Sequence, residues 1–142
     1  MSQEDALPIA KIIQTIRVFY PEAQAVYLFG SFTRGDARPE SDVDLAILLP
    51  YEAAKAVGPI AFSDCADALS ELLNKSIDLV NLREVDTVFQ HEIVQTALRL
   101  YTGDENETAT FEMLVLSFYQ KLNEERREIL ENILQSGRVL KE

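Results

Sequence analysis

The chain has 142 residues, the size of one domain with its own hydrophobic core. It carries 13 Lys and Arg against 24 Asp and Glu, and this net charge of -11 argues against nucleic acid as a principal partner, because phosphates repel an acidic surface. The single cysteine excludes an intramolecular disulfide, and the sequence contains neither a secretory leader nor the roughly 20 consecutive apolar residues that a membrane span requires. We therefore expect a cytoplasmic protein with no direct binding to nucleic acid or to a membrane.

Hydrophobic periodicity predicts helices that alternate with short buried strands. A short helix is also expected directly after Gly30. No repeat, low-complexity segment or linker interrupts the pattern, so we expect a single domain over residues 1–142. The longer expected elements, in chain order, are a helix over 6–19, strands over 25–30 and 43–49, a helix over 58–74, a strand over 76–82, a helix from 86 to about 98, a strand over 99–103 and a helix from about 107 to 136.

The last expected helix is long for a chain of this size. At 1.5 Å per residue it would extend about 45 Å, whereas a globule of this length is on the order of 35 to 40 Å across. The helix must therefore either break near residues 123–128 and fold back, or overhang the body and offer its apolar face to a partner. The stripe that would form this face contains Phe111, Leu114, Phe118, Leu122, Ile129 and Ile133.

Two aspartates, Asp42 and Asp44, open the second expected strand. Residues two apart in a strand point to the same face, so both carboxylates project away from the face of Val43 and Leu45. Asp78 has the same setting in the third strand, and the three carboxylates converge if the two strands are neighbours. Such like charges repel by roughly 4 kcal/mol at about 4 Å, so a cation is required. Ligands that are oxygen only favour Mg²⁺.

The preceding residues supply groups that suit a phosphate. Gly30 ends a strand and lets a ligand approach the backbone, Ser31 offers a hydroxyl and a backbone N–H, and Arg34 lies one helical turn further on the same side. Next to a carboxylate–metal cluster, this arrangement suits a nucleoside triphosphate.

The stretches "GSFTRG" and "SDVDLA" (residues 30–35 and 41–46) resemble the signature of the DNA polymerase β superfamily of nucleotidyltransferases. Within it, the small acidic members known as MNT antitoxins, which are encoded beside HEPN ribonuclease toxins, are similar to this chain. The resemblance implies an α/β (α+β) nucleotidyltransferase fold, in which a small mixed β-sheet is flanked by helices, with a catalytic core over about 1–104 and a C-terminal helical segment over about 105–142.

The resemblance also implies roles for individual residues. Gly30, Ser31 and Arg34 would bind the triphosphate of ATP, and Asp42 and Asp44 would ligate two Mg²⁺ ions. Asp78 would complete one metal site and help to deprotonate the attacking hydroxyl. Its assignment depends on the strand context alone, because the distance of the third carboxylate from the motif varies in the family.

The expected activity is the transfer of one or more AMP units from ATP to a tyrosine of a cognate HEPN toxin, with a homo-oligomer or a hetero-oligomer with the toxin as possible assemblies. Two alternatives remain open at this point. One is an aminoglycoside-type nucleotidyltransferase, whose cationic substrate suits an acidic cleft. The other is a non-catalytic antitoxin that masks a basic ribonuclease with its acidic surface.

Overall fold

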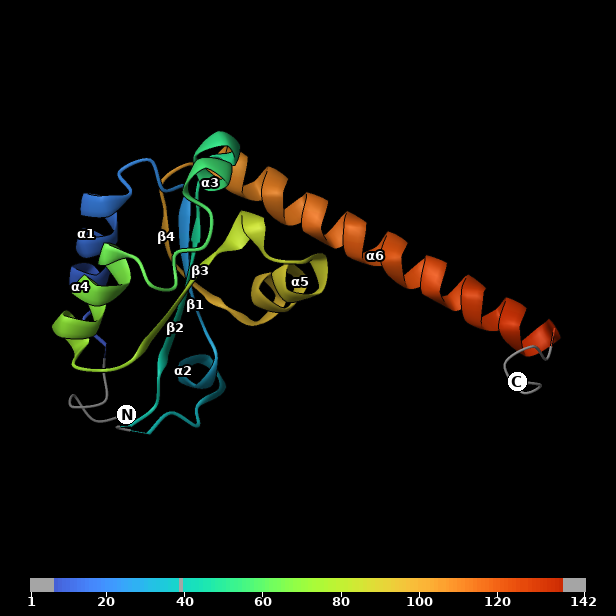
Figure 1. Cartoon of the computed structure of the whole chain (residues 1–142), viewed down its shortest axis with the longest axis horizontal. Helices are drawn as coiled ribbons and strands as arrows, with labels where there is room; N and C mark the ends of the chain where they lie inside the picture. Colours follow the sequence, from blue (N-terminus) through green and yellow to red (C-terminus); the bar gives the residue numbers. More distant parts are fainter. Residues whose placement is uncertain (1–6, 39, 137–142) are drawn as a thin grey trace.

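The computed structural model describes residues 7–38 and 40–136 of the chain (Figure 1). Helices and strands alternate through most of it, as the sequence pattern predicts. In chain order the elements are α1 (Ile9–Phe19), β1 (Ala25–Phe29), α2 (Ser31–Arg34), β2 (Val43–Leu48), α3 (Tyr51–Val57), α4 (Asp64–Leu73), β3 (Ile77–Asn81), the 3-10 helix η2 (Leu82–Glu84), α5 (Thr87–Thr96), β4 (Leu98–Thr102) and α6 (Glu105–Ser136).

The four strands form one sheet in the order β3-β2-β1-β4. Strand β1 is antiparallel to both β2 and β4, whereas β2 and β3 are parallel. The connection from β2 to β3 passes through α3 and α4, as parallel neighbours require a long crossover. The small mixed sheet flanked by helices that the sequence predicts is therefore confirmed.

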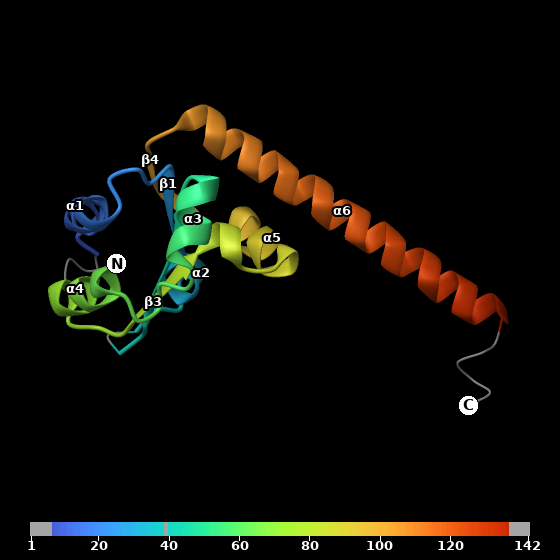
Figure 2. The ribbon, with the colours of Figure 1, turned by 45° about the horizontal axis from the view of Figure 1, so that its top comes forward.

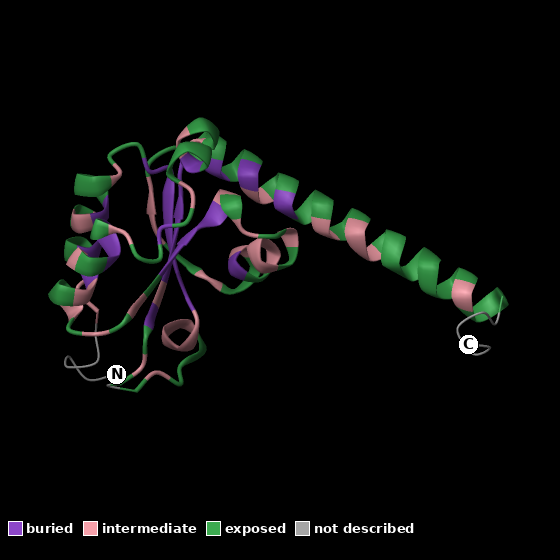
Figure 3. Ribbon diagram, in the orientation of Figure 1, coloured by how far each residue is buried: buried purple, intermediate pink, exposed green. Residues whose placement is uncertain are grey.

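The sheet separates two hydrophobic cores (Figure 3). Val43, Leu45 and Ile47 of β2 belong to the core that α1 and α4 cover. Ala46 and Leu48 alternate with them and belong to the second core, on the side of α5 and α6. Because the central strands are buried on both faces, the alternation fixes which face each residue of β2 occupies.

Two of the expected helix boundaries are wrong. The helix expected over 58–74 begins only at Asp64, because the Ser63 side chain accepts a hydrogen bond from Ala66 N (3.2 Å) and caps the helix there. Gly58 instead follows the end of α3, an element that the sequence pattern did not predict. Helix α1 begins at Ile9, directly after Pro8, and residue 6 lies outside the described residues.

Helix α6 does not break or fold back. Its 32 described residues correspond to about 48 Å, and it projects beyond the body in both views (Figures 1 and 2). Near its start, Glu112 accepts hydrogen bonds from Tyr27 Oη (2.6 Å) and from a guanidinium nitrogen of Arg99 (2.8 Å). The imidazole of His91 in α5 stacks on Tyr119 with the ring centroids 3.5 Å apart. These contacts fix the direction in which the helix leaves the sheet.

Across residues 7–38 and 40–136, every helix is too short or too polar to cross a membrane.

Candidate active site

The candidate site lies at the end of the sheet where β1 stops and β2 and β3 begin. Strand β1 ends at Phe29, and Gly30 follows with φ 78° and ψ -149°, a backbone conformation that residues with a Cβ rarely adopt. This conformation turns the chain into α2. The hydroxyl of Thr33 donates to Gly30 O (2.8 Å) and closes the turn.

The neighbouring Asp44 side chain is a second reason why position 30 must be a glycine. Strands β1 and β2 pair with Phe29 opposite Asp44, which brings the Asp44 side chain against the Gly30 backbone. A Cβ built on Gly30 would lie 1.9 Å from Asp44 Oδ2. The glycine of the "GS" pair therefore provides the space that the second aspartate of "DVD" occupies.

The carboxylates of β2 and β3 occupy one face of the sheet. Asp44 and Asp78 are register partners in the parallel pair β2–β3, so their side chains project from the same face. Their neighbours Val43 and Leu79 are buried in the core on the other face. Asp42, two residues before Asp44, directly precedes the first residue of β2 and is exposed. The strand adjacency on which the sequence prediction depended is thus present.

The electrostatic environment of Asp44 reflects this arrangement. Partial burial raises the pKa of the Asp44 carboxyl above its usual range, and the negative charges of Asp78 and Asp42 raise it further. Arg34 acts in the opposite direction and lowers this pKa. Within the described parts of the chain, however, no three acidic, histidine or cysteine side chains gather closely enough to form a complete metal-ligand cluster.

The expected phosphate-binding residues lie beside this face. Ser31 is the first residue of α2 and is partly buried, and Arg34 is the last. The Arg34 side chain is 63% exposed, and its Nε lies 3.7 Å from Asp36 Oδ2. Such an exposed ion pair contributes about 0 to 1 kcal/mol, so the guanidinium exchanges this partner easily for a stronger anion.

An aromatic pair that the sequence pattern did not predict lies next to the acidic residues. Phe29, opposite Asp44 in the β1–β2 ladder, meets Phe89 of α5 edge to face, with the ring centroids 5.8 Å apart. The two rings form an apolar contact on the same face of the sheet as the acidic side chains. The alternation of residues in β1 could have predicted that Tyr27 and Phe29 lie on the same face. The contact of Phe29 with α5 depends on tertiary packing and could not be predicted in this way.

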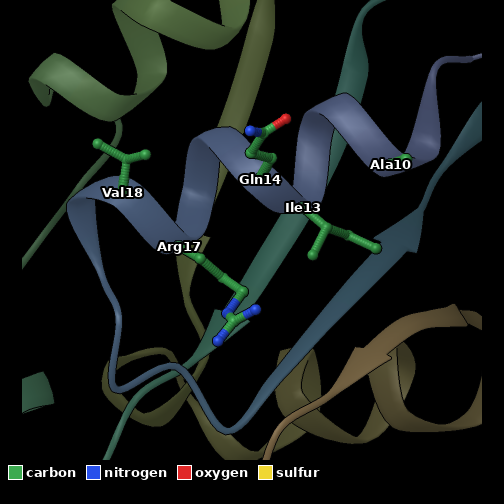
Figure 4. A pocket seen from close by; sticks show the side chains of 5 residues that line it. All are labelled: Ala10, Ile13, Gln14, Arg17 and Val18. Carbon is green, nitrogen blue, oxygen red and sulfur yellow. The ribbon is translucent and has the colours of Figure 1, made fainter.

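A shallow hollow on α1 lies away from this site (Figure 4). Helix α1 covers the opposite face of the sheet from Asp44, and the guanidinium of Arg17 stands 5.2 Å from the ring centroid of Tyr101. The side chains around the hollow come from this one helix, so it is a feature of the helix surface. They belong to Ala10, Ile13, Gln14, Arg17 and Val18.

The fold and the acidic face next to a Gly-Ser turn define a nucleotidyltransferase. Residues 10–106 match the family described as Polymerase beta, Nucleotidyltransferase, and the chain belongs to this family. The resemblance, the fold class and the enzyme class expected from the sequence are therefore confirmed.

Individual proteins that are similar to the chain give a more specific comparison than the family. The chain is 34% identical over 124 residues to the protein adenylyltransferase MntA of Shewanella oneidensis, a match that covers 87% of this chain and 86% of the relative. It is similar to a chain in the crystal structure of a toxin–antitoxin complex with AMP-PNP (TM-score 0.70, 31% identity, 90% of this chain and 99% of that chain). It is also similar to a chain in the structure of the tri-AMPylated S. oneidensis HEPN toxin in complex with MNT antitoxin (TM-score 0.62, 29% identity, 89% and 95% covered).

Proposed function

We propose that the chain transfers AMP from ATP to a tyrosine hydroxyl of a cognate HEPN toxin and thereby silences it. The observation that carries the proposal is the register of Asp44 and Asp78 beside Gly30, which gathers like charges at the end of a phosphate-binding turn. The relatives support AMP as the transferred group and the toxin as the acceptor. One relative is named a protein adenylyltransferase, and one similar chain was solved in complex with a tri-AMPylated toxin.

The donor set fits Mg²⁺. Asp42, Asp44 and Asp78 offer carboxylate oxygens, the ligands that this cation prefers. A nearby cation would also remove the repulsion that raises the pKa of Asp44. We infer that these residues hold two Mg²⁺ ions, whose positive charge would stabilise the charge on the reacting phosphates.

The triphosphate would bind at the turn. Gly30 contributes the turn that leads into α2, since the space beside its Cα is occupied by Asp44, and the Ser31 hydroxyl at the start of α2 donates a hydrogen bond to a phosphate oxygen. Arg34 would exchange its exposed contact with Asp36 for the triphosphate, which carries more charge. These three groups orient the α-phosphorus toward the face that carries Asp78.

The transfer requires one proton acceptor. The acceptor oxygen attacks the α-phosphorus, a new P–O bond forms, and the bond from the α-phosphorus to the bridging oxygen breaks with release of pyrophosphate. Asp78 takes the proton of the attacking hydroxyl. A tyrosine hydroxyl, with a pKa near 10, needs less assistance than an aliphatic hydroxyl.

The charge of the chain favours a basic protein as the acceptor. We propose that residues up to about 104 form the catalytic core, since all six candidate residues lie within it, and that the helical segment from about 105 has another role. The net charge of -11 would steer a basic ribonuclease toward the site.

Intact-mass spectrometry tests the proposal. Incubation of the toxin with ATP, Mg²⁺ and the chain should add steps of about 329 Da, the mass of AMP less water, and abolish its ribonuclease activity. The variant Asp42→Asn/Asp44→Asn should add no mass. Asp64→Asn/Asp67→Asn removes two charges from exposed positions of α4 and is the matched control.

Two other outcomes would replace the proposal. Inhibition of the toxin without mass gain, retained by Asp42→Asn/Asp44→Asn, indicates a non-catalytic binding antitoxin. Mass gain on an aminoglycoside, with none on the toxin, indicates an enzyme that modifies small cationic substrates.

A further inference from the structure

Three side chains form a row across the sheet at the candidate site. Asp44 is the register partner of Phe29 in the antiparallel pair β1–β2 and of Asp78 in the parallel pair β2–β3. Adjacent strands lie about 4.8 Å apart, so the backbones of Phe29 and Asp78 are about 10 Å apart, with Asp44 between them. Register partners project from the same face of a sheet. The row is therefore acidic toward β3 and aromatic toward β1.

Helix α5, on the side of the sheet opposite α1 and α4, extends the aromatic end of the row (Figure 1). The Phe89 ring meets the Phe29 ring edge to face and is partly buried, so part of the ring remains accessible. Asp86 caps α5 and accepts a hydrogen bond from Phe89 N (2.8 Å). Gln90 Nε2 donates to the backbone of η2 (2.9 Å). The backbone around Phe89 is thus fixed before a ligand binds, which lowers the entropic cost of binding.

The surroundings of Phe89 suit an uncharged planar group. Asp86 and Glu92, three residues before and after it, are acidic, and Asp44 lies beside its neighbour in the row. These carboxylates repel a phosphate, whereas the aromatic ring binds another planar ring through its face or its edge. A reaction between ATP and a tyrosine involves two such rings, the adenine base and the phenol ring of the acceptor.

The direction of the transfer distinguishes these two rings. Asp78, the proposed proton acceptor, stands at the β3 end of the row, so the attacking hydroxyl approaches the α-phosphorus from that side. The attacking and the leaving oxygens lie roughly in line in phosphoryl transfer, so the pyrophosphate leaves toward the side of β1, where α2 carries Arg34. The acceptor ring is therefore on the side of β3. Phe89, at the β1 end, is left for the nucleoside of ATP.

We propose that the adenine base of ATP packs against the ring of Phe89, next to Phe29, and that this contact orients the α-phosphate over Asp44. The inference rests on the proposed function, which supplies ATP as the donor and Asp78 as the proton acceptor. Packing of a base on an aromatic side chain contributes about tenfold or more to affinity. Phe89 is thus a positioning residue for the nucleotide.

Calorimetry of the full chain with Mg²⁺ tests the inference with two ligands, a non-hydrolysable ATP analogue and inorganic tripolyphosphate. Phe89→Leu keeps an apolar side chain against Phe29 but removes the planar ring. It should weaken binding of the ATP analogue about tenfold and leave the affinity for tripolyphosphate unchanged, because tripolyphosphate has no base. Phe89→Tyr retains the ring and should bind both ligands as the wild type does. Val94→Ala, which shortens a partly buried side chain of α5 in the same core, is the matched control and should do likewise.

Three results would overturn the inference. Equal affinity of Phe89→Leu and the wild type for the ATP analogue would mean that the base binds elsewhere. An equal loss of tripolyphosphate affinity in Phe89→Leu would mean that Phe89 supports the fold of the whole site. An unchanged affinity for the ATP analogue with a raised KM for the toxin would assign the ring to the acceptor tyrosine.

The proposed function can fail separately from this inference. If the wild type and Phe89→Leu differ in affinity for the ATP analogue as expected, but the wild type adds no mass to the toxin, the base contact is supported and the proposed acceptor is wrong.

Discussion

The Asp44 carboxylate occupies the space that a side chain on Gly30 would need: a Cβ there would lie 1.9 Å from Asp44 Oδ2. The Gly30 turn, where we propose that phosphate binds, and the acidic strand β2 are therefore in direct contact. They are two parts of one site, and a change in either displaces the other.

Gly30→Ala should abolish nucleotide transfer and lower the free energy of unfolding by about 1 to 3 kcal/mol, because the Asp44 side chain must move and the backbone at φ 78° becomes strained. Gly35→Ala is the matched control. Gly35 also has a positive φ, of 81°, but a Cβ at this position would meet no atom within 4 Å. It should lose about 1 kcal/mol of stability and retain activity. Chemical denaturation and a transfer assay distinguish the two, and full activity of Gly30→Ala would contradict the described contact.

Asp44→Asn should stabilise the fold at neutral pH. The pKa of Asp44 is higher in the folded chain than the ordinary value of 3.8, because of burial and the charges of Asp78 and Asp42. The folded state therefore binds more protons, and its stability falls as the pH rises from about 3.8 through the folded pKa. The variant lacks this loss, so its melting temperature should exceed that of the wild type at pH 7.

The difference between Asp44→Asn and the wild type should vanish when the pH falls below about 3.8, where Asp44 is protonated in both states. Glu71→Gln, which removes an exposed charge from α4, serves as a control. A destabilised Asp44→Asn at pH 7 in the absence of Mg²⁺ would mean that its ionised carboxylate is favoured in the fold.

Substitutions of the proposed triphosphate-binding residues and of the proposed proton acceptor should affect different kinetic constants. Ser31→Ala and Arg34→Ala each remove a group that we propose binds the triphosphate, and each should raise the KM for ATP about tenfold or more. Asp78→Asn removes the proposed proton acceptor and should lower kcat by about 10²- to 10⁴-fold. Steady-state kinetics with the toxin as acceptor measures both effects, and Arg38→Ala in the same loop is the control. An unchanged kcat in Asp78→Asn would assign the proton to another group.

Tyr27→Phe should lower the free energy of unfolding by about 1 to 2 kcal/mol, because it removes the hydrogen bond to Glu112 while Arg99 still contacts that carboxylate. Burial and the neighbouring Glu112 raise the pKa of the Tyr27 hydroxyl strongly, so the hydroxyl remains a donor throughout the neutral range. The loss should therefore be constant between pH 6 and about 9. Denaturant titrations at several pH values give the measurement. A loss that disappears at pH 9 would indicate that Tyr27 ionises there.

Local patterns predicted the four strands and the face of the sheet on which the carboxylates lie. The alternation of Val43, Asp44 and Leu45 determined the face of the carboxylates before the strand order was known. The register of Asp44 with Asp78, and the contact of Asp44 with Gly30, depend on strand pairing between distant segments, which no local pattern encodes.

The missed helix has a similar explanation. Helix α3 is seven residues long, and Ala54 is its one buried residue, so it shows no apolar stripe in the sequence. Gly58 was expected to open a helix, but it ends α3, because its φ of 67° suits a glycine after a helix. For α6, helix length against domain size left a break and an overhang as alternatives, and the unbroken helix Glu105–Ser136 decides for the overhang.

Because Phe29 and Asp44 are opposite each other in one antiparallel ladder, the segment between them starts and ends at a fixed separation. Its exposed residues, among them Gly35, Asp36 and Arg38, do not determine where the Gly30 turn and the acidic strand meet. Loop length can therefore vary at little energetic cost, since a doubling adds only about 0.6 kcal/mol of closure entropy. A slip of one residue in the β1–β2 ladder would instead turn Asp44 toward the opposite core. An inserted tag or a protease cut should therefore be tolerated in the exposed loop around Gly35, Asp36 and Arg38. The β1–β2 ladder beside this loop should tolerate no such change.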